Sequence, residues 1–243
     1  MKIGITERGD AGIDLSWEKK IDQVDGVILI TKNITKEFRN AAINSKEKAI
    51  VHATCTGYGG TVLEPNVPEY QEQIKAIKQL VKEGFPIEQI VLRVDPIIPT
   101  VEGLKIAAKV INRAREEVPG ISRVRFSLID MYPHVRERFQ TQNVLLPYGD
   151  GFYPRKEDLQ RTNKWLHKQK EMHPIHFEAC AENVDAEQIG CVSIRDLQIL
   201  GLEMQQEIRG YQRKGCLCLR CKTELLTEKR QCPHQCLYCY WKG

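Results

Sequence analysis

Short aliphatic runs alternate with amphipathic stretches along most of this chain. The aliphatic runs predict buried strands, and they cover residues 3–6, 26–31, 49–54, 89–94, 123–129 and 175–179. Helices are predicted over 70–82, 101–117, 156–170 and 196–209. Strands that alternate with helices favour parallel pairing. The pattern therefore predicts an α/β fold, a partial or complete parallel (β/α) TIM-like barrel followed by a cysteine-rich C-terminal iron–sulfur tail.

Polar and glycine residues collect where five of the predicted strands end. They are Thr31-Lys32-Asn33, Cys55 to Gly60, Arg93 with Asp95, Asp130, and Glu178 with Cys180 and Glu182. Barrels of this kind carry their chemistry at the carboxyl ends of the strands, so these groups predict one shared mouth. Residues 1–195 are expected to form the barrel-like core. Residues 196–243 are expected to form a helix and a cysteine-rich segment that folds back on the mouth.

Composition narrows the class of protein. Of the 243 residues, 42% are hydrophobic and 28% are charged, which suits a chain with a real core and a hydrated surface. No apolar run approaches the ~20 residues of a membrane span, so no membrane partner is predicted. The net charge of +4 is mild and does not demand nucleic acid. Nine cysteines, an odd number, and a charged N-terminal segment favour reduced thiols in the cytoplasm over disulfides.

The last twelve residues carry the most specific chemistry. Cys232, Cys236 and Cys239 stand in the spacing C-x-x-x-C-x-x-C, and Tyr238 precedes the third thiol. Three thiolates can hold three irons of a [4Fe–4S] cluster and leave the fourth iron open to a small molecule. The alternative is a zinc knuckle with His234 as the fourth ligand, although its position inside the loop makes an awkward chelate.

This spacing, with its aromatic residue, resembles the cluster motif of radical S-adenosylmethionine (SAM) enzymes. In those enzymes the open iron chelates SAM, and an electron from the cluster cleaves SAM to a 5′-deoxyadenosyl radical. The motif usually follows the first strand, whereas here it stands at the C terminus. That order resembles a domain-of-unknown-function family, and the barrel segments distantly resemble spore photoproduct lyase, a radical SAM enzyme of DNA repair. The matching segments are Thr31–Asn33, Thr56–Gly59, Leu63–Pro68, Arg93–Ile98, Ala179–Glu182, Cys191, Cys216–Cys218 and Cys232–Tyr240.

The resemblance also implies a second cluster. Cys180, Cys191, Cys216 and Cys218 match the family and are expected to hold an auxiliary [4Fe–4S] cluster. Cys221 stands where the family usually has serine, which leaves the ligand set open. A zinc site made from the same thiols is the alternative.

Candidates for binding SAM come from the predicted mouth. Lys32 or Arg93 is expected to meet the SAM carboxylate, unless each instead forms a salt bridge with Asp95 or Glu64. The other candidates are Asn33, Ser127 and Glu178 for the ribose hydroxyls, Gly57 for close backbone approach, and Tyr58 and Tyr238 for the adenine or the cluster. Cys55 is expected to be a buried small hydrophobe.

The predicted function is a radical SAM enzyme that abstracts hydrogen from an organic substrate, with a reductant such as flavodoxin or ferredoxin as partner. A nucleobase-containing substrate ranks first, because of the lyase resemblance and the basic tail, ahead of a peptide or small metabolite. The alternative is a non-catalytic module in which zinc or clusters stabilise a nucleic-acid-binding tail. The basic residues are Arg209, Arg213, Lys214, Arg220, Lys222, Lys229 and Arg230.

Overall fold

The computed structural model of this chain describes residues 1–203, 210, 215–228 and 231–241. The strands are β1 (Ile3–Ile5), β2 (Gly26–Thr31), β3 (Ala49–Thr54), β4 (Ile90–Ile97), β5 (Arg123–Leu128), β6 (His176–Ala179), β7 (Glu187–Gln188) and β8 (Lys222–Glu224). The α-helices are α1 (Lys36–Asn44), α2 (Tyr70–Lys82), α3 (Val101–Glu117), α4 (Pro133–Thr141), α5 (Lys156–Met172) and α6 (Ile194–Ile199). Short 3₁₀ segments are η1 (Leu15–Gln23), η2 (Lys46–Lys48) and η3 (Ile87–Gln89).

The strands form one parallel sheet in the order β7-β6-β5-β4-β3-β2-β1-β8. This is the order of a (β/α) barrel opened between β7 and β8, because β8 pairs with β1 at the register Ile3↔Lys222. Among the described residues β7 and β8 do not pair, so a closed barrel is not observed. The two edges still touch through neighbouring loops, where the Leu219 amide donates to the Val192 carbonyl at 3.1 Å. The predicted α/β fold with a parallel sheet is confirmed.

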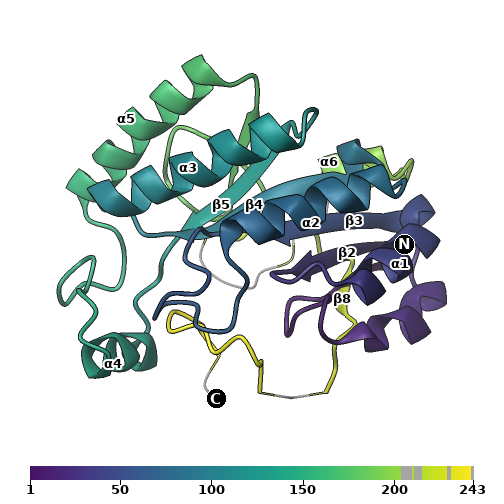
Figure 1. Cartoon of the computed structure of the whole chain (residues 1–243), viewed down its shortest axis with the longest axis horizontal. Helices are drawn as coiled ribbons and strands as arrows, with labels where there is room; N and C mark the ends of the chain where they lie inside the picture. The colour runs from purple at the N-terminus through teal and green to yellow at the C-terminus, as the bar shows by residue number, and fades with distance from the viewer. Residues whose placement is uncertain (204–209, 211–214, 229–230, 242–243) are drawn as a thin grey trace.

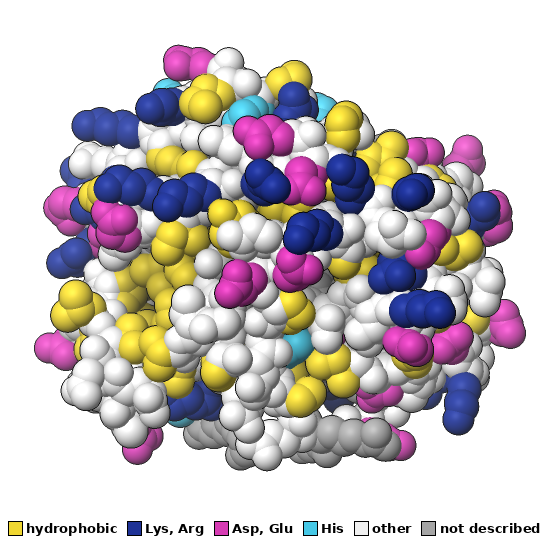
Figure 2. All heavy atoms as spheres, viewed as in Figure 1, with side chains coloured by type: hydrophobic (Ala, Val, Ile, Leu, Met, Phe, Trp, Pro, Cys, Tyr) yellow, Lys and Arg dark blue, Asp and Glu magenta, His cyan; other side chains and the backbone are white. Residues whose placement is uncertain are grey.

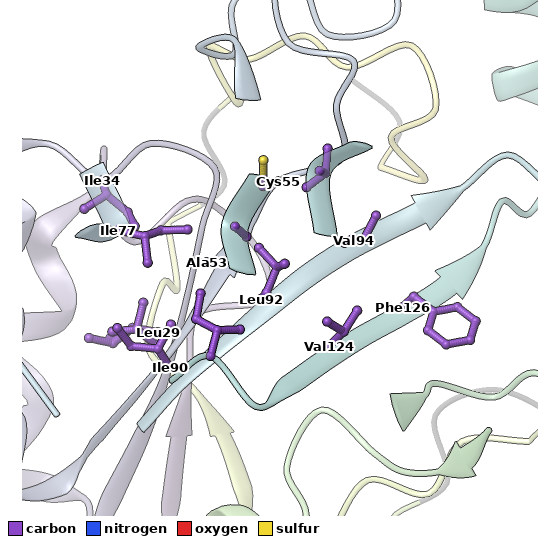
Figure 3. Close-up of a cluster of buried hydrophobic side chains, with 14 of the residues drawn as sticks. Leu29, Ile34, Ala53, Cys55, Ile77, Ile90, Leu92, Val94, Val124 and Phe126 are labelled. Atoms are coloured by element: carbon purple, nitrogen blue, oxygen red, sulfur yellow. The ribbon is translucent and has the colours of Figure 1, made fainter. Parts of the chain in front are cut away.

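Helices α2, α3 and α5 lie side by side over one face of the sheet (Figure 1). Successive side chains of a strand point to opposite faces, so Val27 and Leu29 of β2 pack toward the helices while Ile28 and Ile30 join a second cluster on the other face. Every residue of β2 is buried, as expected for a parallel sheet that is covered on both faces. Figure 3 shows the helix-side cluster, in which Cys55 lies among aliphatic side chains.

The other face carries a row of polar side chains that the strand register brings together. Thr54 pairs with Arg93, Arg93 with Arg125, and Arg125 with Glu178, across β3, β4, β5 and β6. The neighbouring Arg93 and Arg125 would repel each other. Two carboxylates offset the charge of Arg125, because Glu178 accepts from it at 2.8 Å and Asp196 of α6 lies 3.4 Å from it. Paired charges of this kind are the form in which a sheet interior tolerates ionised groups.

The predicted helix over 196–209 is wrong in its extent. Helix α6 covers Ile194–Ile199 and stops because Gly201 adopts φ +67° and the Leu202 amide returns to the Leu197 carbonyl at 2.9 Å. A left-handed glycine closed by such a bond is a standard helix ending. Residues 204–209 lie outside the described part of the chain. The segment after α6 supplies β8, so part of the predicted tail belongs to the sheet itself.

The surface seen in Figure 2 mixes basic and acidic side chains, and neither sign dominates that face. Within the described residues no helix combines the length and the apolar character needed to cross a membrane. Five of the basic residues assigned to the tail, Arg209, Arg213, Lys214, Lys229 and Arg230, lie outside the described residues.

Candidate functional site

One cavity of about 680 Å³ opens at the carboxyl ends of the strands, and its lining includes residues that end β1 to β5. Seven of the nine cysteines line it: Cys180, Cys191, Cys216, Cys218, Cys232, Cys236 and Cys239. We refer to Cys232, Cys236 and Cys239 as the tail thiols and to the other four as the second thiol set. A volume of this size suits a drug-sized ligand or cofactor. Two groups of thiols therefore face one shared space.

The tail thiols sit in two consecutive tight turns. The Gln235 amide returns to the Cys232 carbonyl at 3.3 Å, and the Cys239 amide to the Cys236 carbonyl at 3.0 Å. Burial raises the pKa of the Cys236 thiol to about 12, with nearby Lys32 opposing the shift and Glu64 adding to it. Burial also raises the pKa of Cys232. A thiolate here is costly unless a cation such as iron accompanies it.

His234, inside the cysteine loop, anchors the loop to the barrel. Its Nε2 lies 2.8 Å from an oxygen of Asp10, and its Nδ1 lies 3.2 Å from the carbonyl of Asn66. The Asn66 side-chain amide in turn donates to the Pro233 carbonyl at 2.7 Å. The zinc-knuckle alternative requires a free ring nitrogen on His234 to bind the metal. Both ring nitrogens are instead occupied by protein groups, so His234 is placed to hold the loop.

Lys32, Glu64 and Tyr238 form a compact group beside Cys236, in which Glu64 and Tyr238 are buried and Lys32 is partly buried. The Lys32 ammonium lies 2.7 Å from Glu64 and 2.7 Å from the Tyr238 hydroxyl, which itself donates to Glu64. Thr56 donates to the second Glu64 oxygen at 2.6 Å. Burial alone would lower the pKa of Lys32, but Glu64 and Cys236 more than offset it and the pKa is raised. Lys32 is therefore a charged group at the cavity wall, next to a tail thiol.

The second thiol set converges from three segments of the chain. The Cys180 and Cys191 sulfurs are 4.0 Å apart, and the Cys191 amide donates to the Cys218 sulfur at 3.2 Å. The Cys218 amide lies 3.5 Å from the Cys216 sulfur. Hydrogen bonds from Cys218 lower the pKa of the Cys216 thiol to about 6, which favours a thiolate at neutral pH. The residue that follows β6, the loop after β7 and the loop before β8 thus bring their thiols to one place.

Two cations accompany the second thiol set. Arg93 pairs with Asp95, which also accepts from Ser127. Burial would lower the pKa of Arg93, but Asp95 and the nearby thiols of Cys191 and Cys180 raise it. Lys222 of β8 lies 2.7 Å from Glu7 and lines the same cavity. Each group of thiols therefore has a partly buried cation nearby, Lys32 for the tail thiols, and Arg93 and Lys222 for the second set.

The two remaining cysteines stand apart from both groups. Cys55 is fully buried in the helix-side core, where burial raises its pKa, which confirms the expectation of a buried small hydrophobe. Cys221 does not line the cavity. Among the described residues no group of three or more His, Cys, Asp or Glu side chains is arranged to hold a metal ion as it stands. Thiolates of a four-iron cluster bind different irons, so they stand further apart than the ligands of one ion.

The structure brings together only some of the residues predicted to bind SAM. Lys32, Arg93, Ser127 and Tyr238 line the cavity, and the salt bridges considered as alternatives for Lys32 and Arg93 are both formed. The described residues that line the cavity do not include Asn33, Gly57, Tyr58 or Glu178.

Physical reasons account for those four positions. Glu178 is fully buried between Arg123, Arg125 and Arg195. Gly57 adopts φ +88° and lies against helix α3, where a β-carbon would stand 2.4 Å from Ile106. Tyr58 packs in an apolar cluster with Val135 and Phe139 of α4. Asn33 forms a local turn through its backbone, accepting from Thr31 and Thr35.

Sequence reasoning passed over several residues of the cavity. Asp10 follows β1 and accepts from the Thr31 hydroxyl at 2.6 Å and the Lys32 amide at 2.6 Å, in addition to His234. Its position after the first strand is the signal that identified the other strand-end groups. Glu7 and Lys222 also line the cavity, but their pairing depends on β8 lying beside β1, which hydrophobic periodicity does not reveal.

Comparison with known proteins finds one family. A family model described as "Domain of unknown function (DUF1848)" matches residues 14–241. Neither a curated protein nor a solved structure matches the chain. What the site does must therefore be argued from its own residues.

Proposed function

The chain belongs to the DUF1848 family, a family of unknown function, and we propose from its site that it is a radical SAM enzyme. The observation that carries the proposal is that the C-x-x-x-C-x-x-C thiols and a second set of four thiols line one cavity at the carboxyl edge of a parallel sheet. Thiols that only fill the core would not be expected around an open cavity at the sheet edge where α/β enzymes bind their ligands.

The tail thiols suit a [4Fe–4S] cluster in their chemistry. Cys232, Cys236 and Cys239 are soft donors, and the raised pKa values of the first two call for a compensating cation. When bound, such a cluster supplies the open iron that holds SAM and the electron that releases a 5′-deoxyadenosyl radical for hydrogen abstraction. The Lys32 cation offsets negative charge beside Cys236.

Lys32 is also the residue best placed to meet the carboxylate of SAM. Two of its three N–H donors are used by Glu64 and Tyr238, so one is left for a ligand in the cavity that Lys32 lines. Glu64 keeps Lys32 protonated and in place. Tyr238, held by the same group, contributes one wall. Arg93 interacts electrostatically with Cys191 and Cys180 of the second thiol set, so we assign it to that set rather than to SAM.

For the second thiol set we propose an auxiliary [4Fe–4S] cluster held by Cys180, Cys191, Cys216 and Cys218. Four thiols supply a complete set of ligands for a cube, and their convergence from three segments supports this over chance burial. Zinc bound by the same four thiols is the competing assignment. Cys221 is left out of the ligand set because it does not share the cavity.

The substrate is an organic molecule that enters the shared cavity between the two thiol groups. A nucleobase-containing molecule is the first to test, supported by the distant resemblance to spore photoproduct lyase, and a flavodoxin or ferredoxin is the reductant we propose. The second candidate function, a zinc- or cluster-stabilised nucleic-acid-binding module, does not call for a cavity of about 680 Å³ lined by charged groups.

Anaerobic reconstitution tests the proposal. The protein should turn brown, contain roughly eight irons per chain for two cubes, and form 5′-deoxyadenosine when given dithionite and SAM. Alanine at Cys232, Cys236 or Cys239 should abolish 5′-deoxyadenosine, because no other group can hold the open iron. Alanine at Cys55, which lies in the core away from the cavity, is the matched control. A colourless zinc protein, or unchanged SAM cleavage by a variant with alanine at all three of Cys232, Cys236 and Cys239, would exclude radical SAM chemistry.

A further inference from the structure

Helix α4 holds the cysteine loop from outside the barrel. The Arg138 guanidinium donates to the carbonyls of Cys239 at 2.7 Å, Trp241 at 2.8 Å and Leu237 at 3.4 Å. The His134 Nε2 lies 2.9 Å from the carbonyl of Tyr240 and donates to it, since a carbonyl can only accept. Two side chains of one helix thus engage four of the five carbonyls between residues 237 and 241.

The spacing of α4 explains how one short helix does this. Residues four apart share a helix face, so His134 and Arg138 project together toward the loop. Val135 and Phe139 form the adjacent face and are fully buried in a cluster that includes Cys236 and Tyr238. In Figure 1 the C-terminal segment lies on the side of the molecule that carries α4. Apolar packing and hydrogen bonds therefore act on the same stretch of loop.

The loop needs an external support. Residues 231–241 contain no helix or strand, so the carbonyl groups of the loop have few partners of their own. The first half is fastened independently, through His234 to Asp10 and through the Leu237 amide to the Leu63 carbonyl at 3.0 Å. The second half is held at the Tyr238 side chain by Lys32 and Glu64, and at its carbonyls, including that of Cys239, by α4. The planar fork of arginine can hold several carbonyls at once, which a lysine cannot.

We propose that Arg138 is a positioning residue that holds Cys239 in place for the tail cluster. It fixes the Cys239 carbonyl on α4 while the rest of the residue lines the cavity. The inference rests on the proposed function, since it assigns a role toward a cluster at the tail thiols. It predicts that loss of Arg138 frees one of three thiols and spares the second thiol set, which α4 does not contact through any described hydrogen bond.

The test compares Arg138→Met with Arg136→Met. Arg136 lies on the same helix but donates to the carbonyls of Asp150 and Gly151, away from the cysteine loop. After anaerobic reconstitution, Arg138→Met should fall from about eight to about four irons per chain, whereas Arg136→Met should keep the wild-type content. Arg138→Lys should recover part of the loss, because an ammonium can hold one carbonyl. Full iron content in Arg138→Met, with the wild-type change in its electron paramagnetic resonance spectrum on adding SAM, would overturn the proposal.

A second measurement separates this inference from the function on which it rests. Hydrogen exchange on the metal-free full chain follows the amides of Leu237 and Cys239, which bond to the Leu63 and Cys236 carbonyls. The Cys239 amide should exchange about tenfold faster or more in Arg138→Met than in Arg136→Met, as expected when local opening becomes easier. The Leu237 amide, which the Leu63 carbonyl holds independently of α4, should exchange alike in the two variants. Equal exchange of the Cys239 amide in the two variants would refute the proposal that Arg138 holds the loop. If Arg138→Met exchanges faster but the protein never takes up iron, the role of Arg138 in holding the loop would stand and the radical SAM function would be refuted.

Discussion

Replacing Lys32 by methionine is the sharpest test of the charged group beside the tail thiols. The substitution keeps the length of the side chain and removes its charge. It leaves Glu64, whose side chain is 1% exposed, as a buried carboxylate without its cation. Thr56 and Tyr238 still donate to Glu64, so the carboxylate keeps two hydrogen bonds and loses an ion pair.

The expected cost follows from that geometry. Removing one partner of a buried ion pair costs about 3–5 kcal/mol, because the other charge remains desolvated. The two surviving hydrogen bonds should hold the loss near the lower limit, about 3 kcal/mol in the free energy of unfolding. For a chain of this size each kcal/mol lowers the melting temperature by about 2–4 °C, so the midpoint should fall by roughly 6–12 °C.

The pH dependence gives the sign of the effect independently. In the wild type burial alone would raise the pKa of Glu64, but Lys32 and the hydrogen bonds lower it below 4.5. The ionised Glu64 therefore contributes stability above pH 4.5, and this is lost as the pH falls through the lowered pKa. Without Lys32, burial should raise the pKa of Glu64 above 4.5. The cost of Lys32→Met should then shrink as the pH is lowered from 8 toward 4.5, because Glu64 becomes protonated.

Urea denaturation of the metal-free chain, followed by circular dichroism at pH 8 and pH 5, measures both effects. A double-mutant cycle with Glu64→Gln isolates the pair, and the double variant should be more stable than Lys32→Met alone. Lys75→Met, which removes an exposed partner of Glu72, is the control and should leave stability unchanged. The idea of a coupled Lys32–Glu64 pair would be refuted if Lys32→Met lowered the free energy of unfolding by less than about 1 kcal/mol, as for a surface ion pair. It would also be refuted if the effects of Lys32→Met and Glu64→Gln were additive.

Three further outcomes are expected. Cys221→Ser should keep full iron content, since this thiol lies outside the cavity; a loss of about four irons per chain would return it to the ligand set. Asp196→Asn should lower the free energy of unfolding by about 3–5 kcal/mol in urea melts, because Asp196 is fully buried against two arginines of β5. Unchanged melts would show that these charges are not coupled. Gly57→Ala should lower the free energy of unfolding by about 1–3 kcal/mol, because Gly57 faces Ile106 rather than the cavity. Its SAM affinity should be unchanged in calorimetry. Weaker SAM binding without lost stability would instead place Gly57 at the ligand.

Local pattern accounts for most of the framework. The strands over 26–31 and 49–54 and the helices over 70–82 and 101–117 form where predicted, because burial of a strand or of one helix face imposes a period that the sequence displays directly. The spacing of Cys232, Cys236 and Cys239 is equally local, and it defines the tail thiols without reference to the fold. Lys32 and Arg93 were found as strand-end residues because parallel strands end at one edge.

Only the tertiary structure decided how distant segments meet. The register of β3 to β6 placed Glu178 among arginines rather than at a ligand, and the pairing of β8 with β1 brought Lys222 to Glu7. Helix α6 ended before Gly201, whose left-handed conformation the helical periodicity of the sequence does not predict. The support of the cysteine loop by Arg138 depends on α4 packing against residues about 100 positions later. Such contacts depend on register, chain direction and packing, so the sequence determined which chemical groups exist and the fold determined which of them share a cavity.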